Sequence, residues 1–583
     1  MTRTAWRILF SMFAIFAIMA VAVACGDDDD DDGGDTTPGG GSTATQPSGG
    51  GGEPKEGGSL KVQYLDVQSW DPHFSSFAQD IGHHGFVWRG LYKLDKENNP
   101  VPEMAASEPE VSADGLTYTV KLKDGLKWSD GEPLTAADFV AGVHRTCDPD
   151  NAGQYFYLLS NIVGCDDFYT ANGDPEGDPP VAAKSAEEKE QLREAIGVKA
   201  VDETTIEYTL IEQQPTWPMI LTMWMTYPVP RHIVKTSGEA WPSDPTKLAF
   251  NGPFKLQSYT TKSGAVFVRN DNYAGQHPAY LDQVEFVYIE DNAQSNNAFR
   301  SGEISVALAD TSNLTVLQSE FKDELLSYPQ PATIALQMQM ERQPLDNEKV
   351  RLALSRAIDR DTLANNVLQG AVLPTTSWIP ADVAKIEEGA FDDEVGFDPD
   401  AAKKLLDEAG YPNGQGFPKL TILIRDTPSN TATANFLQAE FKEHLGIDVD
   451  IEVVDAPTRS RRFTTEDFEL FPGGWIQDYP DPENWIIGLF DKDGTLNHYN
   501  CFDSDIDTLI GKARYNTNNE ERLEQYREIN ELISTRACGA APMYHQANHI
   551  LVSPKVGGIE EFHSSQDRVL AADWAPEEWY LND

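Results

Sequence analysis

Apolar and polar residues alternate along much of the first half of the chain. The alternation is clear at Leu60–Leu65, Leu116–Leu122, Val266–Asn270 and Val284–Ile289. Such a period of two places one face of a β-strand in a core and the other toward solvent. The chain up to about residue 290 is therefore predicted to be rich in β-strands.

Beyond residue 290 the spacing of apolar residues becomes mixed, with helical and strand patterns in turn. Strands that alternate with helices predict a parallel or mixed sheet covered by helices. We therefore expect an α/β protein with two lobes, one β-rich and one α/β, and a ligand site between them. The expected helices are Ala136–Arg145, Asn292–Ser301, Asn347–Asn366, Asp398–Gly410 and Thr431–Leu445, and the expected strands of the second half are Leu420–Ile424, Asp448–Val454 and Met543–Val552.

The longest apolar run lies at the N-terminus, from Ile8 to Ala24, behind Arg3 and Arg7. A basic start followed by such a run is typical of a secretory signal. The run ends at Cys25 after small residues, as in the cleavage site of bacterial lipoproteins, although Ala22 stands where leucine is usual. The sequence predicts a signal peptide over residues 1–24 and a lipid-carrying Cys25. The alternative is an uncleaved membrane anchor, for which the run is short.

Residues 25–58 are predicted to form a tether. They contain the run Asp27–Asp32 and then glycine, serine, threonine and proline, with no aromatic residue. Such a segment buries too little apolar surface to offset the entropy of ordering it. The aspartates are expected to be a solvated spacer rather than a cation site.

Charge narrows the classes of function. Lys+Arg is 45 and Asp+Glu is 94 over 583 residues, which gives a formal net charge of −49. Binding of nucleic acid or of an anionic membrane surface depends on clustered lysine and arginine, so both are excluded. The acidic surface is expected to favour solubility.

Four cysteines follow Cys25, and an exported chain meets an oxidising space. Neighbours in sequence suggest the disulfides Cys147–Cys165 and Cys501–Cys538, and other pairings stay open. No pair has the CxxC spacing of a zinc or redox site. No metal and no cofactor are expected.

The chain also lacks the common catalytic motifs. It has no G-x-S-x-G, H-E-x-x-H, Walker or G-x-G-x-x-G sequence, so an enzyme is not expected. His545 and His549 have metalloprotease-like spacing but no glutamate between them, and they fall in an expected strand. The adjacent His83 and His84 are expected at the surface.

The run Phe471–Trp485 combines glycines, aromatic residues and Asp478. Glycine permits close approach to the backbone, and tryptophan and tyrosine provide apolar walls with polar tips. Asp478 is the natural centre of a site for an amine. A tight aromatic turn in which Asp478 only bonds the backbone is the equal alternative.

A series of short blocks, in order over some 500 residues, carries a resemblance to one family. From about Leu60 onward the chain resembles the large family 5 (peptide/nickel-type) solute-binding proteins of bacterial ABC importers. The blocks are Ser69–His73, Gly90–Tyr92, Ser112–Gly131, Pro133–Phe139, Asn251–Phe254, Arg269–Tyr273, Val350–Asp359, Gly474–Pro482 and Ala541–Tyr544.

The resemblance implies a two-lobe, three-domain binder that closes over its ligand at a hinge. Lobe I is expected at 59–290 plus 545–583, with an inserted subdomain at about 93–200, and lobe II at 291–544. The chain crossings near Glu290 and Tyr544 would form the hinge. The protein would be a monomer, anchored by lipid on the outer face of the cell membrane, that delivers peptides to an ABC permease and its ATPase.

The resemblance also implies ligand contacts. Asp478 would pair with a peptide α-amino group, and Tyr155 would lie near the ligand. The backbones of Gly474, Trp475 and Ile476 and of a loop formed by Ser76, Phe77 and Ala78 would pair with an extended peptide. Trp475 would also line a side-chain pocket.

The chain departs from some peptide binders in one respect. Pro472 and Gly473 stand where those proteins have an arginine just before the Gly-Trp pair. Arg459, Arg461 and Arg462 lie upstream, and whether one of them binds a ligand carboxylate stays open. Because the family includes binders of metal chelates, opines and oligosaccharides, another solute is the alternative ligand, and a secreted hydrolase is a weaker one.

Overall fold

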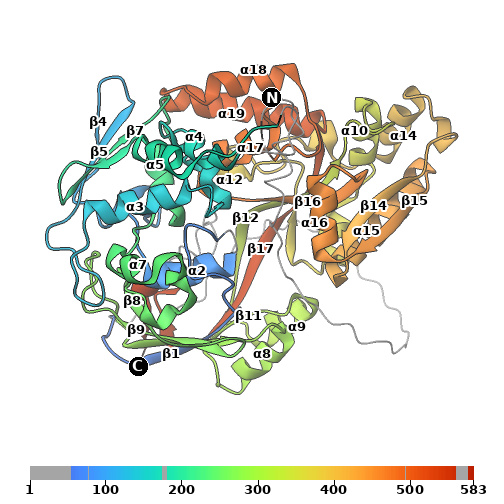
Figure 1. Ribbon diagram of the computed structural model, residues 1–583. Coiled ribbons are helices and arrows are strands. Elements are labelled where there is room, and N and C mark those ends of the chain that lie inside the picture. Colours follow the sequence, from blue (N-terminus) through green and yellow to red (C-terminus); the bar gives the residue numbers. More distant parts are fainter. Residues whose placement is uncertain are drawn as a thin grey trace.

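The computed structural model describes residues 54–75, 78–173, 180–492, 494, 496–559 and 575–582 (Figure 1). The predicted signal peptide, Cys25, nearly all of the tether, Ser76 and Phe77 lie outside these ranges. Within them, no helix combines the length and the apolar character that crossing a bilayer requires.

One large mixed sheet runs through the molecule, in the order β15-β14-β16-β12-β17-β11-β1-β10-β9-β8. The strands predicted from alternation at Leu60–Leu65, Val266–Asn270 and Val284–Ile289 are confirmed and lie in this sheet. The short β13 (Val372–Pro374) also pairs with β17. The strands are β1 Ser59–Tyr64, β8 Phe254–Thr260, β9 Gly264–Arg269, β10 Gln283–Tyr288, β11 Val306–Leu308, β12 Leu325–Met338, β14 Leu420–Arg425, β15 Val449–Val454, β16 Leu470–Ile476 and β17 Ala540–Val552.

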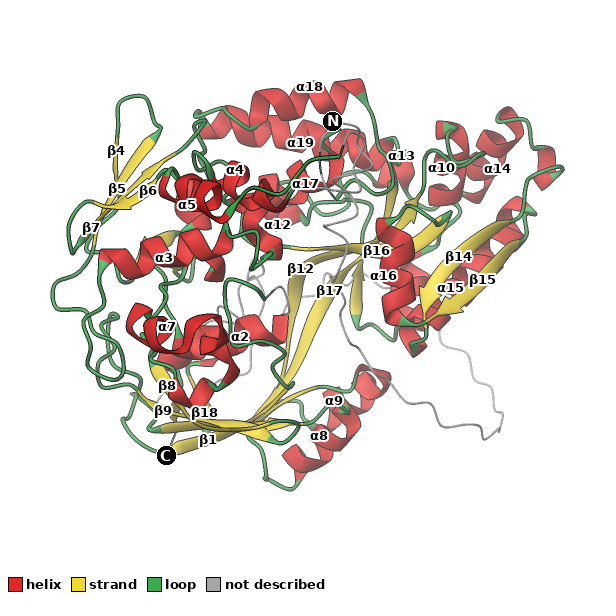
Figure 2. Cartoon of the chain, viewed as in Figure 1, coloured by secondary structure: helices red, strands yellow, loops and turns green. Residues whose placement is uncertain are grey.

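The long strands β12 and β17 connect the two halves of the sheet (Figure 2). Residues 325–329 of β12 pair with residues 547–551 of β17, next to the end of β17 that pairs with β11. Residues 332–338 of β12 pair with β16. The register of β12 against β17 shifts between Pro329 and Thr333. Since β11 also pairs with β1, the segment around α8 (Asn292–Arg300) and α9 (Leu314–Glu320) lies on the β1 side.

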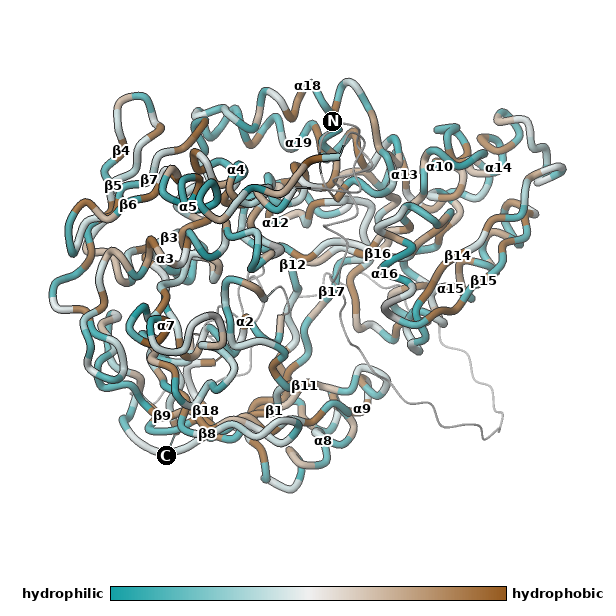
Figure 3. The backbone as a smooth tube through the Cα atoms, viewed as in Figure 1, coloured by the Kyte–Doolittle hydropathy of each residue, from teal (hydrophilic) through white to brown (hydrophobic). Residues whose placement is uncertain are grey.

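The first lobe adds a separate four-stranded sheet in the order β4-β5-β7-β6, which α3 (Ala136–Thr146) contacts. As predicted, Thr135 precedes α3, and its backbone N–H donates to the Asp138 carboxylate at 2.8 Å. The charged helix α5 (Ala186–Glu194) buries no residue, and its tube is teal in Figure 3. The other strands are β2 Tyr92–Leu94, β3 Pro100–Pro102, β4 Glu110–Val111, β5 Thr117–Lys121, β6 Val198–Ala200 and β7 Thr205–Thr209.

The second lobe packs helices against β14, β15 and β16 (Figure 1). The single helix predicted over Asn347–Asn366 is wrong. The chain leaves the helix after Arg356 and restarts after Asp359, whose carboxylate accepts the Thr362 N–H at 2.9 Å. An aspartate that bonds backbone N–H groups favours a helix start over a helix interior. The main helices are α10 Glu348–Arg356, α14 Pro399–Glu408, α15 Pro428–Glu440, α16 Ala456–Thr464, α18 Ser504–Ala513 and α19 Asn519–Thr535.

The prediction that His83 and His84 lie at the surface is also wrong, because α2 (Ala78–Val87) is buried along most of its length. His83 Nε2 lies 2.9 Å from the Tyr288 hydroxyl, and His84 Nε2 lies 3.0 Å from Ser69 O. Burial lowers the pKa of His83 to about 4 and that of His84 to about 3, so both rings are neutral. Adjacent residues point apart on a helix, but both directions here lead into the core.

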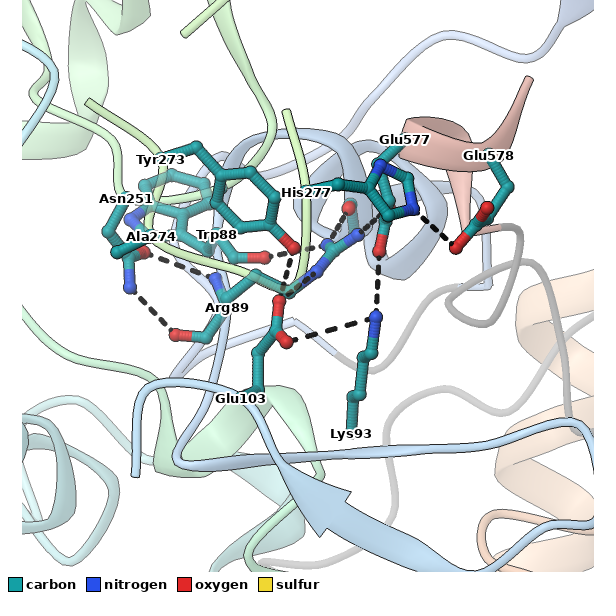
Figure 4. Close-up of polar contacts among 12 residues, drawn as sticks. Trp88, Arg89, Lys93, Glu103, Asn251, Tyr273, Ala274, His277, Glu577 and Glu578 are labelled. Atoms are coloured by element: carbon teal, nitrogen blue, oxygen red, sulfur yellow. Dashed lines mark hydrogen bonds and ion pairs between the residues drawn. The ribbon is translucent and has the colours of Figure 1, made fainter. Parts of the chain in front are cut away.

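The C-terminal segment returns to the first lobe, where Glu577 is buried among charged residues (Figure 4). Arg89 Nη2 donates to its carboxylate at 2.6 Å and Lys93 Nζ at 3.2 Å. Glu103 lies 3.5 Å from Arg89 Nε and 3.8 Å from Lys93 Nζ. Beyond it, β19 (Tyr580–Leu581) pairs with β18 (Val556–Gly557).

Candidate ligand-binding site

Asp478 lies just after β16, at the start of a turn that Asn484 stabilises. The Asp478 N–H and the indole Nε1 of Trp475 donate to Asn484 Oδ1, at 2.8 and 3.0 Å. The Asn484 amide then donates to Asp478 Oδ2 at 3.1 Å. These bonds fix the direction of the carboxylate, and its contact here is with the Asn484 side chain rather than with the backbone.

Two tyrosines of the other lobe meet this carboxylate. Tyr155 and Tyr157 lie on the short helix Gln154–Leu158, and their hydroxyls are 2.8 Å from Asp478 Oδ1 and 3.5 Å from Oδ2. Burial raises the pKa of both tyrosines well above 10, so they stay protonated and donate. Tyr155 was singled out from the sequence and Tyr157 was missed, although the Tyr-x-Tyr spacing was visible.

Among the residues that the structure describes, no cationic side chain is paired with Asp478. Only 6% of the residue is exposed, and burial raises the pKa of its carboxyl to about 6 against the lowering effect of Asn484 and the tyrosines. No lysine, arginine or histidine of the described residues forms an ion pair with it. A buried carboxylate held only by neutral donors retains a large desolvation cost.

The acids that follow in sequence have different surroundings. Asp481 forms two hydrogen bonds with Arg522, at 2.5 and 2.9 Å, so its charge is neutralised within the second lobe. Glu483 accepts from the Thr216 hydroxyl of the first lobe at 3.2 Å, and burial raises its pKa. Tyr479 is buried in the core cluster of the first lobe. The turn after β16 therefore packs against segments from the first half of the chain.

One edge of β16 is free near Asp478. Gln477 N–H bonds Pro331 O, and Gln339 N–H bonds Glu469 O, so the odd-numbered residues of β16 pair with β12. In an antiparallel pair the intervening residues point to the opposite edge. On that edge β14 pairs with Leu470 only, so Gly474 and Ile476 have no strand partner among the described residues.

The predicted backbone contacts have distinct positions. Gly474 is exposed, whereas Trp475 and Ile476 are half-buried. A Cβ on Gly474 would lie 1.6 Å from Thr333 O, so only glycine permits β16 and β12 to approach at this point. Ala78 is the first residue of α2, and Ser76 and Phe77 lie outside the described residues.

The three arginines of α16 differ in their partners. Arg462 forms ion pairs with Glu452 at 2.6 Å and Asp467 at 3.1 Å, and Arg461 is exposed. Arg459 Nη2 donates to Pro472 O at 2.6 Å, and its guanidinium lies 3.8 Å from the centre of the Phe471 ring. Burial, with a contribution from Arg425, lowers the pKa of Arg459 to about 9.

No group of three or more histidine, cysteine or acidic side chains within the described ranges could hold a metal ion. His545 and His549 both lie on β17, as predicted, and contact the hydroxyls of Thr333 and Ser327. The cysteines form the two disulfides suggested by sequence proximity, Cys147–Cys165 and Cys501–Cys538.

Comparison with known proteins agrees with this architecture. The periplasmic oligopeptide-binding protein OppA of Salmonella typhimurium is 28% identical over 504 residues, which cover 85% of this chain and 88% of that protein. The probable deoxycholate-binding periplasmic protein YgiS of Escherichia coli is 28% identical over 492 residues, covering 84% and 87%. A solved periplasmic oligopeptide-binding protein from Borrelia burgdorferi superposes with a TM-score of 0.72 at 25% identity, over 91% of this chain and 100% of that one.

The match to a family model is equally broad. The model described as "Bacterial extracellular solute-binding proteins, family 5 Middle" covers residues 99–497, which include Tyr155, Arg459 and Asp478. This family consists of binding proteins rather than enzymes, and its fold has two lobes with a mixed α/β architecture. The chain belongs to the bacterial extracellular solute-binding proteins of family 5.

Proposed function

We propose that this protein binds peptides with a free amino terminus between its lobes and delivers them to an ABC importer. The observation that carries the proposal is Asp478, a buried carboxylate beside which the described part of the chain places no cationic side chain. The ammonium group of a ligand would supply the missing charge and the hydrogen bonds that water provided before burial.

The free edge of β16 supports an extended main chain as the rest of the ligand. Gly474 and Ile476 direct their backbone groups to this edge, which ends at Asp478. A peptide added there gains main-chain hydrogen bonds that do not depend on its side chains. The half-buried Trp475 offers an aromatic surface beside this edge.

Closure of the lobes would complete the site. Tyr155 and Tyr157 from the first lobe contact Asp478 from the second, and Thr216 contacts Glu483 in the same way. We place the hinge at β12 and β17, because these strands connect the two halves of the sheet. The register of β12 against β17 also shifts between Pro329 and Thr333. Ligand binding would favour the closed form through contacts to both lobes.

Delivery to a transporter follows from the family and from the N-terminal sequence. The pattern Ala22–Cys25 supports a lipid anchor on the outer face of the membrane, with residues 26–58 as a tether. Several relatives are named oligopeptide- or dipeptide-binding proteins. The protein would act as a monomer with a permease and an ATPase as partners.

The test is calorimetric titration with a peptide library and with the same peptides acetylated at the amino terminus. We expect Asp478→Asn and acetylation each to weaken binding by about 100-fold or more, since each removes one member of a buried charge pair. The exposed Asp450→Asn is the matched control and leaves affinity unchanged. Equal affinity for free and acetylated peptides would rule out the amine anchor.

A second candidate ligand is another small solute of the kind named for the Escherichia coli relative, a steroid acid. Such a ligand has no amine, so its binding would not depend on the charge of Asp478. A thermal-shift panel of peptides, bile acids, sugars and metal chelates separates the candidates, because a bound ligand raises the unfolding midpoint. A shift with deoxycholate alone would favour this candidate over peptides.

A further inference from the structure

The disulfide Cys147–Cys165 closes a loop that contains both tyrosines of the Asp478 site. The two cysteines are 18 positions apart, and Tyr155 and Tyr157 lie between them. Both cysteines are buried in the same core cluster. The residues that present hydroxyls to the buried carboxylate are therefore part of a short, covalently closed loop.

The loop is attached to the fold at the end of α3. Cys147 directly follows α3, and the two residues before it are held by side-chain bonds. Arg145 Nη2 donates to the Asp71 carboxylate at 2.6 Å. The Thr146 hydroxyl donates to Met225 O at 2.7 Å. Because distant segments hold the end of α3 in this way, Cys147 is a firm point of attachment.

The other cysteine begins a helix that supports the tyrosines. This helix is α4 (Cys165–Tyr169), and its last ring stacks on Phe156 with 3.4 Å between centroids and 4° between planes. Phe156 is buried and lies between Tyr155 and Tyr157 in sequence. By fixing the start of α4, the disulfide also fixes the aromatic platform on which the tyrosine segment packs.

The backbone bonds within the tyrosine segment are local. Gln154–Leu158 is a 3₁₀ helix, a form with poorer hydrogen-bond geometry than an α-helix. The N–H groups of Phe156 and Leu159 donate to Gly153 O at 3.3 Å and to Phe156 O at 2.8 Å. Segments held by such bonds open more readily than core elements. A disulfide opposes this opening, because it removes conformations from the open ensemble.

We propose, resting on the peptide-binding function above, that Cys147 and Cys165 are positioning residues of the ligand site. Their disulfide keeps the segment of Tyr155 and Tyr157 in the conformation that meets Asp478 when the lobes close. Without it, only a fraction of the molecules has this conformation. The apparent dissociation constant for a peptide then rises by the inverse of that fraction.

The second disulfide, Cys501–Cys538, is the matched control. It is also buried, and it closes a loop that spans α18 and α19. Among the described residues, the groups that bond the Asp478 carboxylate all lie outside that loop. Loss of either disulfide is expected to lower the unfolding midpoint, but only loss of Cys147–Cys165 is expected to weaken peptide binding.

The experiment replaces each disulfide with a pair of alanines, Cys147→Ala with Cys165→Ala and Cys501→Ala with Cys538→Ala. Calorimetry measures peptide affinity well below the unfolding midpoint of every variant. We expect the first pair to weaken binding by about tenfold, as when the competent fraction falls to about one in ten, and the second pair to stay within about twofold. Amide hydrogen exchange should accelerate at residues 148–164 in the first pair alone.

A double-mutant cycle separates positioning from a general loss of structure. Tyr155→Phe with Tyr157→Phe removes the two hydroxyls that the disulfide is proposed to place. In that background, loss of Cys147–Cys165 should weaken binding no further, because no hydroxyl is left to position. An equal loss of affinity with and without the hydroxyls would assign the effect to structure and overturn the proposal.

The outcomes also separate this proposal from the peptide-binding function. If the wild type binds no peptide, that function falls, while faster exchange at residues 148–164 in the first alanine pair alone still supports the positioning. Equal exchange in the two alanine pairs overturns the proposal, and so does equal peptide affinity. If the first pair does not fold, Cys147→Val with Cys165→Ala replaces it, because valine fills more of the space that the sulfur atoms occupied.

Discussion

Glu577 and Asp478 are both buried carboxylates, but their surroundings are opposite. Burial alone would raise the pKa of Glu577, yet Arg89 and Lys93 hold it at about 2 (Figure 4). Asp478 has only neutral donors, and its pKa rises to about 6. Around Glu577 the chain supplies its own counter-charges, whereas around Asp478 the described residues supply none.

This difference separates a buried carboxylate with a structural role from one that is available to a ligand. A matched cluster such as that around Glu577 fixes one segment against another and has no charge left for a ligand. An unmatched buried charge lowers stability and persists where something outside the chain completes it. Asp478 is of this second kind.

The largest expected effect comes from breaking the matched cluster. Glu577→Gln leaves Arg89 and Lys93 buried without their main partner, which should lower the free energy of unfolding by about 3–5 kcal/mol. Denaturant or thermal unfolding midpoints measure the loss. Glu578→Gln, whose carboxylate is a quarter exposed and pairs with His277, is the control and should cost less than about 1 kcal/mol. Equal midpoints for the two variants would contradict the contrast.

At Asp478 we expect a substitution to change the free energy of unfolding in the opposite direction. Asp478→Asn removes an unmatched charge and should raise the stability of the ligand-free protein by about 1–2 kcal/mol at pH 7.5. The pKa of Asp478 is about 6 in the folded protein and near 3.8 in the unfolded chain. Burial of this group therefore costs no stability below about pH 3.8, and the folded state loses stability as pH rises through about 6. The gain of the variant should therefore shrink at pH 4. A destabilised variant at pH 7.5 would show that Asp478 is a structural group like Glu577.

The pH dependence of ligand affinity tests the same distinction with the smallest effect. A peptide amine stays charged below about pH 7.7, whereas Asp478 is protonated as pH falls through about 6. Affinity should fall by about tenfold for each pH unit below that value, because the ammonium then meets a neutral acid. Titrations of wild type and Asp478→Asn between pH 5 and 7.5 measure this. A slope retained by the variant would assign the pH dependence to another group.

Local patterns predicted much of the fold. Alternation identified β1, β9 and β10, and capping residues marked the starts of α3 and α14. The helix over Asn347–Asn366 was misjudged, because its apolar spacing continues through a break at Asp359 that a side-chain cap produces. The buried pair His83 and His84 was missed, because the depth of α2 depends on strands from distant parts of the chain.

The candidate site was predicted only in part for the same reason. Asp478 stood out because glycines and aromatic residues surround it in sequence. Tyr157 did not, since its role depends on a contact between residues 321 positions apart in the chain.

Short-range sequence determined where strands and helices begin, that Gly474 allows close approach and that a carboxylate follows β16. Only the tertiary structure decided which charges are matched, because matching depends on residues far apart in the chain. Arg89 and Glu577 are separated by 488 positions, and Tyr155 and Asp478 by 323. Burial removes water from all of these groups alike, and the packing of distant segments determines whether the chain or a ligand replaces it.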